Sequence, residues 1–115
     1  MSVLIVDDHP SFRASARAVL QAEGFEVVGE AADGAGALEA VRTLRPDVVL
    51  LDVQLPDSDG FAIAAELTKD SDGPAVVLTS SRDAADFGPL IAESGARGFI
   101  PKAEISCASL TALLE

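Results

Sequence analysis

Acidic, hydroxyl and amino side chains follow four separate apolar runs in this sequence. Asp7 and Asp8 come after the first run, Asp52 after the second, Thr79 after the third, and Lys102 two residues after the fourth. If these runs are parallel strands of one sheet, their carboxyl ends meet at one edge, where such sheets bind ligands. Three carboxylates that are held together repel one another unless a cation joins them. Oxygen-only ligands favour Mg²⁺, with Mn²⁺ as a substitute, over zinc or copper.

A site of this kind is suited to phosphoryl transfer. Mg²⁺ with few protein ligands recruits phosphate oxygens, and catalysis is then mostly positioning and neutralisation of charge. Asp52 is the predicted nucleophile, which would form an acyl phosphate. Lys102 and the hydroxyl of Thr79 are predicted to contact the phosphoryl oxygens. The formal net charge is −11, which predicts that this chain by itself binds neither nucleic acid nor a membrane surface.

The segments that must position these residues alternate between short apolar runs and stretches with helical spacing. Strands are predicted at 3–6, 25–28, 48–51, 74–78 and 98–100, and the last helix is predicted at 105–114. Asp33 and Asp59 are predicted to begin the second and third helices. Five strand-helix units favour a flavodoxin-like α/β fold, a three-layer sandwich whose five-stranded parallel sheet has the order 2-1-3-4-5.

A proline complicates the fourth helix. Pro89 would weaken the interior of a long helix, but it costs nothing in the first turn, where its missing N–H has no partner. With Asp86 as the N-cap, Pro89 falls in that turn. We therefore expect a short fourth helix after a loose loop over 80–85.

Several other residues have an ordinary structural interpretation. Asp57 is predicted to be a turn or cap residue, and His9 an exposed loop residue, because oxygen ligands already suffice for a cation. The lone Cys107 is predicted to be a small buried side chain of the last helix. No apolar run approaches the length of a membrane span and no leader is visible, so we expect a cytoplasmic chain.

Five segments at the predicted strand ends resemble a known family when they are taken together and in order. They are Asp7-Asp8-His9-Pro10, residues 50–57, Asp59-Gly60, residues 77–80 and residues 98–102. The sequence resembles response-regulator receiver domains of two-component signalling along nearly its whole length. Its Asp-Asp-His-Pro opening is similar to regulators that have a helix-turn-helix DNA-binding output domain. No such segment follows Lys102, so we expect residues 1–115 to be one receiver domain without an output domain.

The resemblance implies a role for each matching residue. Asp52 would be phosphorylated by a sensor histidine kinase, and Thr79 and Phe99 would form the switch pair. The Mg²⁺ ligands would be Asp7, Asp8, Asp52 and the main-chain carbonyl of Gln54. Phosphorylation would change the surface made by the fourth helix, the fifth strand and the last helix, which would then form a homodimer or release an output domain.

Three other functions compete with this one. A degenerate receiver would only bind a partner protein. A phosphatase of the haloacid dehalogenase kind needs an acid two residues after its nucleophile, where this chain has Gln54. A flavin-binding module needs an anion cradle where this chain has Asp7 and Asp8. We therefore expect no conventional enzyme, only self-catalysed phosphorylation and slow autodephosphorylation, whose rate Gln54 and Ser81 would tune.

Overall fold

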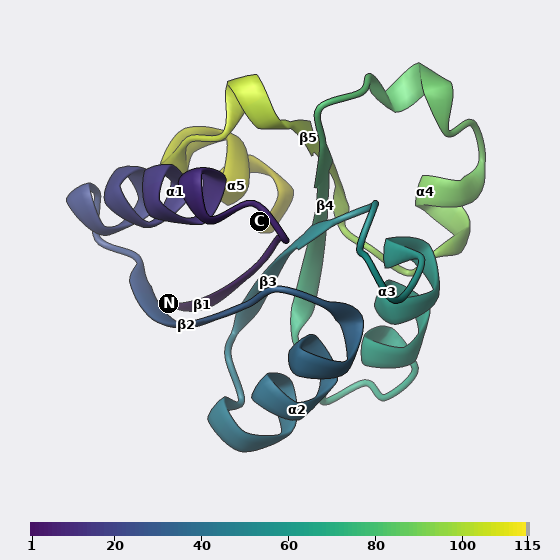
Figure 1. The fold of residues 1–115 in the computed structure, drawn as a ribbon, viewed down its shortest axis with the longest axis horizontal. Coiled ribbons are helices and arrows are strands. Elements are labelled where there is room, and N and C mark those ends of the chain that lie inside the picture. The colour runs from purple at the N-terminus through teal and green to yellow at the C-terminus, as the bar shows by residue number, and fades with distance from the viewer. Residues whose placement is uncertain (115) are drawn as a thin grey trace.

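A five-stranded parallel sheet with the order β2-β1-β3-β4-β5 forms the centre of the structure, a computed structural model that describes residues 1–114 (Figure 1). The strands are β1 Ser2–Val6, β2 Glu26–Ala31, β3 Val48–Asp52, β4 Ala75–Ser80 and β5 Gly98–Pro101. The α-helices are α1 Pro10–Ala22, α2 Gly34–Leu44, α3 Gly60–Thr68, α4 Leu90–Glu93 and α5 Cys107–Leu114. The predicted flavodoxin-like fold and strand order are confirmed.

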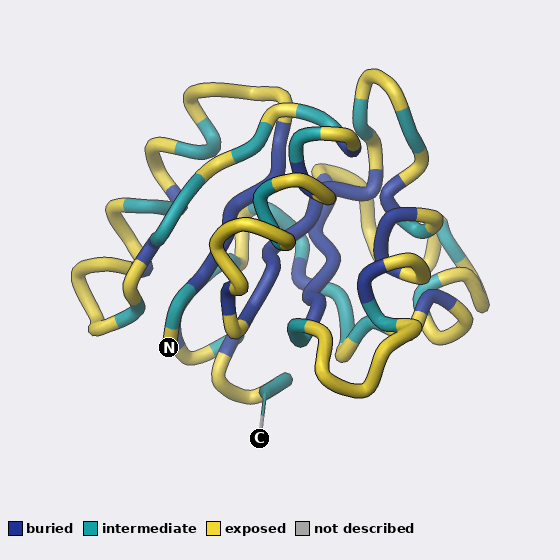
Figure 2. The backbone as a smooth tube through the Cα atoms, turned by 90° about the horizontal axis from the view of Figure 1, so that it is seen from below, coloured by how far each residue is buried: buried dark blue, intermediate teal, exposed yellow. Residues whose placement is uncertain are grey.

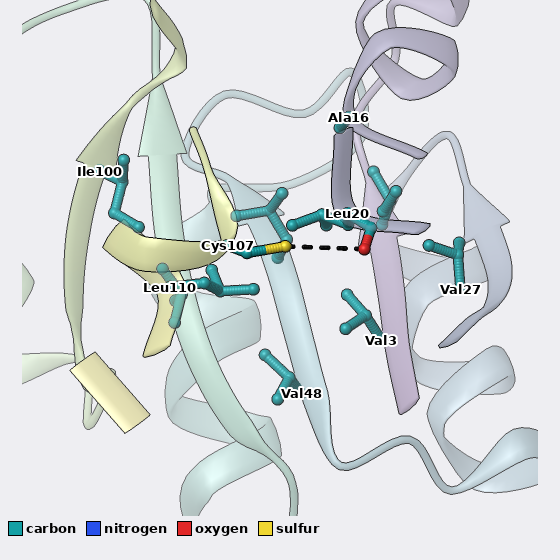
Figure 3. Close-up of a cluster of buried hydrophobic side chains, with 11 residues drawn as sticks. Val3, Ala16, Leu20, Val27, Val48, Ile100, Cys107 and Leu110 are labelled. Atoms are coloured by element: carbon teal, nitrogen blue, oxygen red, sulfur yellow. Dashed lines mark hydrogen bonds between the residues drawn. The ribbon is translucent and has the colours of Figure 1, made fainter. Parts of the chain in front are cut away.

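The sheet separates two buried layers, because successive side chains of a strand point to opposite faces. In β1, Val3 and Ile5 belong to a cluster with Leu20 of α1 and Leu110 of α5, part of which is drawn in Figure 3. Leu4 and Val6 belong to the other cluster, which includes residues of α2 and α3. Figure 1 shows α1 and α5 on one side of the sheet and α2, α3 and α4 on the other. The buried strands form the middle of the molecule in Figure 2.

The second strand is longer than predicted and begins later. Phe25 precedes β2, which continues through Gly29 to Ala31. Its pairing with β1 shifts by one residue between Val3 and Leu4 and then continues to Ala31.

The predicted start of the fourth helix is wrong, although its shortness is confirmed. Asp86 ends a separate 3₁₀ turn, η1 Ala84–Asp86, because its side chain and that of Asp83 cap each other's backbone N–H groups. Gly88 has a φ of 56°, in the left-handed region, so the chain changes direction there. Pro89 is the N-cap of α4 rather than a first-turn residue. The loop that we expected to be loose thus contains a capped turn.

The last helix also starts later than predicted. A 3₁₀ turn, η2 Lys102–Glu104, follows β5, and Ile105 is extended before α5 begins. Cys107 is buried as predicted, and its Sγ lies 3.6 Å from the carbonyl oxygen of Leu20 (Figure 3). Burial raises the pKa of this thiol to about 11, so Cys107 is an inert core residue. No helix within residues 1–114 is long and apolar enough to cross a membrane.

Asp33 and Asp59 cap α2 and α3, as predicted. The Asp33 carboxylate accepts a hydrogen bond of 2.7 Å from the backbone N–H of Gly36, and that of Asp59 accepts one of 2.7 Å from Phe61. Each cap satisfies a helix N–H that would otherwise lack a partner. Both helices therefore begin at fixed residues.

Asp57 is a cap residue too, but the helix that it caps comes from another part of the chain. Its carboxylate accepts hydrogen bonds from the backbone N–H groups of Gly34, at 2.7 Å, and Ala35, at 3.1 Å. These bonds hold the pKa of Asp57 below its usual range. They tie the loop after β3 to the start of α2.

The backbone at Gly60 packs directly against the end of β3. A Cβ atom at this position would lie 2.6 Å from the Cα of Val53 and would also clash with the carbonyl oxygen of Asp52. The Gly60 N–H donates a 2.7 Å hydrogen bond to the Val53 carbonyl. Only glycine permits this approach, so Gly60 helps to fix the strand end that carries Asp52.

Gly60→Ala is expected to lower the free energy of unfolding by about 2–3 kcal/mol, because the added methyl overlaps backbone that cannot move aside easily. Urea unfolding measures this loss. Gly24→Ala is the control, because its Cβ would meet nothing within 4 Å and only its φ of 105° is unfavourable. That cost is about 1 kcal/mol. Equal losses in the two variants would contradict the close approach.

Candidate functional site

A pocket of about 220 Å³ lies at the carboxyl edge of the sheet. Its walls come from the β1–α1, β3–α3 and β4–η1 connections and from the residue after β5. The lining residues are Asp8, His9, Asp52, Gln54, Leu55, Pro56, Ser81 and Lys102. The structure therefore brings together side chains that lie far apart in sequence, as the strand order requires.

The central interaction of the pocket is a pair of short ionic contacts made by one lysine. Lys102 Nζ lies 2.7 Å from Oδ2 of Asp7 and 3.1 Å from Oδ2 of Asp52. The Asp7 side chain is 0% exposed, that of Asp52 is 4% exposed, and that of Lys102 is 17% exposed. One ammonium thus balances two carboxylates that have almost no access to water.

The two carboxylates differ in their ionisation. Burial raises the pKa of Asp7, but the Lys102 ammonium and hydrogen bonds from His9 outweigh burial and hold that pKa below its usual range. Burial, supported by the nearby Asp7 charge, raises the pKa of Asp52 above its usual range, and the Gln54 N–H and Lys102 offset this only partly. Burial lowers the pKa of Lys102, but its bonds to both acids outweigh that and raise it. Asp52 is thus the less stable anion of the two.

His9 is exposed, as predicted, yet its ring contacts both acids of the first loop. Nδ1 of His9 lies 3.0 Å from Oδ1 of Asp7 and 3.0 Å from Oδ1 of Asp8. Its backbone N–H donates a 2.8 Å hydrogen bond to Asp7. The spacing within Asp7-Asp8-His9 gave no signal for these ring contacts, because they depend on how the loop turns into α1.

The acidic side chains are close enough to bind one divalent cation. Asp7, Asp8, His9 and Asp52 each offer a ligand atom, and these atoms all lie within 4.8 Å of one another. Oδ2 of Asp7 is buried, and the polar group that meets it is the Lys102 ammonium at 2.7 Å. Carboxylates grouped beside an open pocket are the ligands that Mg²⁺ prefers, so the residues fit such an ion.

Gln54 lies at the pocket, as predicted. Its backbone N–H donates a 3.0 Å hydrogen bond to Oδ1 of Asp52, which orients that carboxylate. Gln54 and Ser81 both line the pocket. That the Gln54 carbonyl is a metal ligand stays a prediction.

Neither of the two predicted switch residues lines the pocket. Thr79 is buried and pairs with Asp52 in the sheet, but its hydroxyl donates a 2.6 Å hydrogen bond to the carbonyl oxygen of Ile100. The ring of Phe99 lies 5.6 Å from that of Phe87, which lies 5.4 Å from that of Phe61. Phe99 therefore contacts the η1–α4 connection.

Sequence reasoning missed one residue that supports the first acidic loop. Arg13 of α1 donates a 2.6 Å hydrogen bond from Nη1 to the carbonyl oxygen of Asp7. Glu30 of β2 binds the same guanidinium, with its Oε1 2.9 Å from Nε of Arg13. The other carboxylate oxygen of Glu30 lies 2.8 Å from Nε of Arg17. The spacing of Arg13 and Arg17, one helical turn apart, was the available signal. The partner on β2 becomes evident only with the strand order.

The sequence of residues 3–115 matches the response regulator receiver domain family. A putative transcriptional regulator of Pseudomonas aeruginosa is 39% identical over 102 residues, which are 89% of this chain and 49% of that protein. The DNA-binding response regulator MtrA of Mycolicibacterium smegmatis is 45% identical over 102 residues, which are 87% of this chain and 43% of MtrA.

Solved structures agree with this assignment. The signal receiver domain of the putative response regulator NarL from Mycobacterium tuberculosis superposes with a TM-score of 0.85 at 38% identity, covering 98% of this chain and 95% of that one. The BeF3-activated N-terminal receiver domain of Klebsiella pneumoniae RstA gives a TM-score of 0.84 at 32% identity, covering 99% and 95%.

The chain belongs to the response regulator receiver domain family. Within that family it is similar to regulators that are described as binding DNA. It spans about half the length of the curated relatives that it matches.

In buffer without divalent ions, Asp52→Asn is expected to raise the free energy of unfolding, because it removes one of two buried like charges. Denaturant unfolding of both proteins measures the difference. Asp72→Asn is the control, because Asp72 is exposed and lies outside this pocket. The free energy of unfolding of this variant should equal that of the wild type. An Asp52→Asn variant that is less stable than the wild type would contradict the electrostatic description of the site.

Proposed function

We propose that this domain is a phosphorylation-dependent signalling switch in which Asp52 accepts a phosphoryl group from a sensor histidine kinase. The observation that carries the proposal is the position of Lys102, whose ammonium faces Asp52 and Asp7 at an open pocket. A carboxylate nucleophile beside a fixed cation is the arrangement that phosphoryl transfer requires.

In the proposed step, a carboxylate oxygen of Asp52 attacks the phosphorus of a phosphohistidine. The new O–P bond forms as the P–N bond breaks, so Asp52 becomes an acyl phosphate and the imidazole leaves with the electron pair of the broken bond. That nitrogen takes a proton from solvent. Lys102 then moves from the Asp52 oxygen to a phosphoryl oxygen, where it meets the charge that has been transferred.

The donor set supports a magnesium-dependent reaction. Asp7, Asp8 and Asp52, with the Gln54 carbonyl, would hold the ion, as the family implies, and a bound ion would neutralise charge on the phosphoryl oxygens. The observation that favours such an ion is that the ligand atoms of Asp7, Asp8, His9 and Asp52 all lie within 4.8 Å of one another, and that Asp8 and Asp52 line an open pocket. Mn²⁺ has the same ligand preference and is expected to replace Mg²⁺.

The proposed response starts at Thr79. Its hydroxyl would leave the Ile100 carbonyl and donate to a phosphoryl oxygen, and the space that it vacates would let the Phe99 ring turn inward. This exchange biases a two-state equilibrium, because only the phosphorylated state offers the new acceptor. The surface formed by α4, β5 and α5 would change, since Phe99 lies on β5 and touches Phe87 before α4.

This surface would control homodimerisation or an output domain. Relatives that are DNA-binding regulators support transcription as the output and a helix-turn-helix domain as its effector. A cytoplasmic location follows from the same proposal, because DNA and the phosphorylated kinase histidine are both reached there. The net charge of −11 argues that such an output domain, rather than this chain, would contact the DNA.

The domain is proposed to catalyse only its own phosphorylation and slow dephosphorylation. The pocket offers Gln54 two residues after Asp52, and an amide cannot serve as the general acid and base that a phosphatase needs. Gln54 and Ser81 line the mouth of the pocket and are placed to affect water that attacks the acyl phosphate. They would set the lifetime of the phosphorylated state.

The protein is expected to gain one phosphoryl group when it is incubated with Mg²⁺ and acetyl phosphate, because a reactive small donor can replace the kinase. Intact-mass spectrometry measures the gain. Asp52→Asn should abolish it, whereas Asp57→Asn, which alters an acid of the same loop outside the pocket, should retain it.

Native protein that gains no phosphoryl group, although it is folded, would instead support a receiver that only binds a partner. Steady release of phosphate from simple phosphate esters would point to a phosphatase. A gain that persists in Asp52→Asn would place the acceptor elsewhere.

A further inference from the structure

The Lys102 ammonium has a third neighbour besides its two carboxylates. Nζ lies 4.7 Å from the centroid of the Phe12 ring, over the ring. Phe12 is in the first turn of α1 and packs against the buried cluster that this helix shares with α5. An ammonium within about 6 Å of an aromatic face is attracted by the ring's negative quadrupole, most strongly where water is excluded.

We propose that Phe12 is a positioning residue for phosphoryl transfer, which keeps the Lys102 ammonium at the pocket while its other partners change. The inference rests on the proposed phosphorylation of Asp52. Phe12 acts only through Lys102 and does not line the pocket.

The need for such a residue follows from the reaction itself. Before transfer, the position of Lys102 is fixed by Asp7 and Asp52, at 2.7 and 3.1 Å. Transfer converts the Asp52 carboxylate into an acyl phosphate, and that contact is lost just as the ammonium must reach a phosphoryl oxygen. A lysine side chain has a flexible four-carbon stem, so a lost anchor widens the range of positions that it samples.

Phe12 is the neighbour that the reaction leaves unchanged. Its ring is uncharged, is not a metal ligand, and is held by core packing and by the helix that begins at Pro10. The ring attracts the ammonium without binding it in one fixed direction. Lys102 can therefore shift between acceptor oxygens and still remain at the pocket.

A purely structural role for Phe12 makes a different prediction. An aliphatic side chain, or a ring with a weaker quadrupole, would fill the same space against the core. Only the negative face of the ring distinguishes positioning of Lys102 from packing. The decisive variants are therefore those that keep the shape of the ring and change its charge distribution.

The test places phenylalanine, 4-fluorophenylalanine or 3,4,5-trifluorophenylalanine at position 12 by site-specific incorporation. Each protein is phosphorylated with acetyl phosphate and Mg²⁺, and intact mass is followed over time. The rate is expected to fall stepwise with fluorination and to be about fivefold lower in the trifluoro protein, which is the size of one cation–π contact. The same analogues at Phe25, which packs against the same cluster, are the matched control and should leave the rate unchanged.

A second readout needs no activity. The Cε protons of Lys102 should be shifted upfield by the Phe12 ring current in the NMR spectrum of the wild type, and Phe12→Leu should remove that shift. Unfolding measurements confirm that each variant is folded.

Equal rates across the position-12 series, or an unchanged Lys102 shift in Phe12→Leu, would overturn the role of Phe12. Wild-type protein that gains no phosphoryl group would overturn the proposed function itself, and the two failures are therefore distinguishable.

Discussion

The organisation of the site depends on one ammonium group that is shared by two buried carboxylates. Without Lys102, the charges of Asp7 and Asp52 would face each other with almost no water between them. Buried ion pairs add little net stability, because desolvation offsets most of the attraction, but removal of one partner leaves an expensive unpaired charge. The arrangement therefore contributes little to the stability of the fold and leaves an excess of negative charge at the site. A phosphoryl group and a divalent ion can relieve this imbalance when they bind.

Backbone contacts from the rest of the fold hold this site in place. The Gly60 backbone packs against the end of β3. The Asp57 carboxylate binds the loop after β3 to the start of α2. The first acidic loop is held from α1 by Arg13, which in turn is bound by Glu30 of β2. The connections after β1 and β3, which both contribute to the pocket, are thus each coupled to a neighbouring element. The proposed switch would pass small movements at Asp52 to other surfaces through such packed contacts.

The sequence predicted the architecture and the convergence of the acids because both follow from strand order. Apolar runs that end in Asp7, Asp52 and Thr79 have only one edge at which to meet once the sheet is parallel. The error at the fourth helix lies where side chains compete for local hydrogen bonds. Asp86 closes a 3₁₀ turn with Asp83 instead of capping α4, a choice that helix propensity alone does not reveal. Contacts between distant segments, such as that of Phe12 with Lys102, also could not be predicted from the helical spacing of apolar residues. That spacing identifies Phe12 only as a core residue.

In the proposed switch, Lys102 and Thr79 exchange their present partners for a group bound to Asp52. A crystal structure with Mg²⁺ and beryllofluoride, a mimic of the phosphoryl group, tests it most directly. The expected structure has an adduct on a carboxylate oxygen of Asp52, with Lys102 Nζ and the Thr79 hydroxyl both at hydrogen-bond distance from its fluorines. The Thr79 bond to Ile100 should then be broken. An adduct elsewhere, or one that leaves Lys102 turned to solvent and Thr79 bonded to Ile100, would show that these two residues do not respond to a group on Asp52.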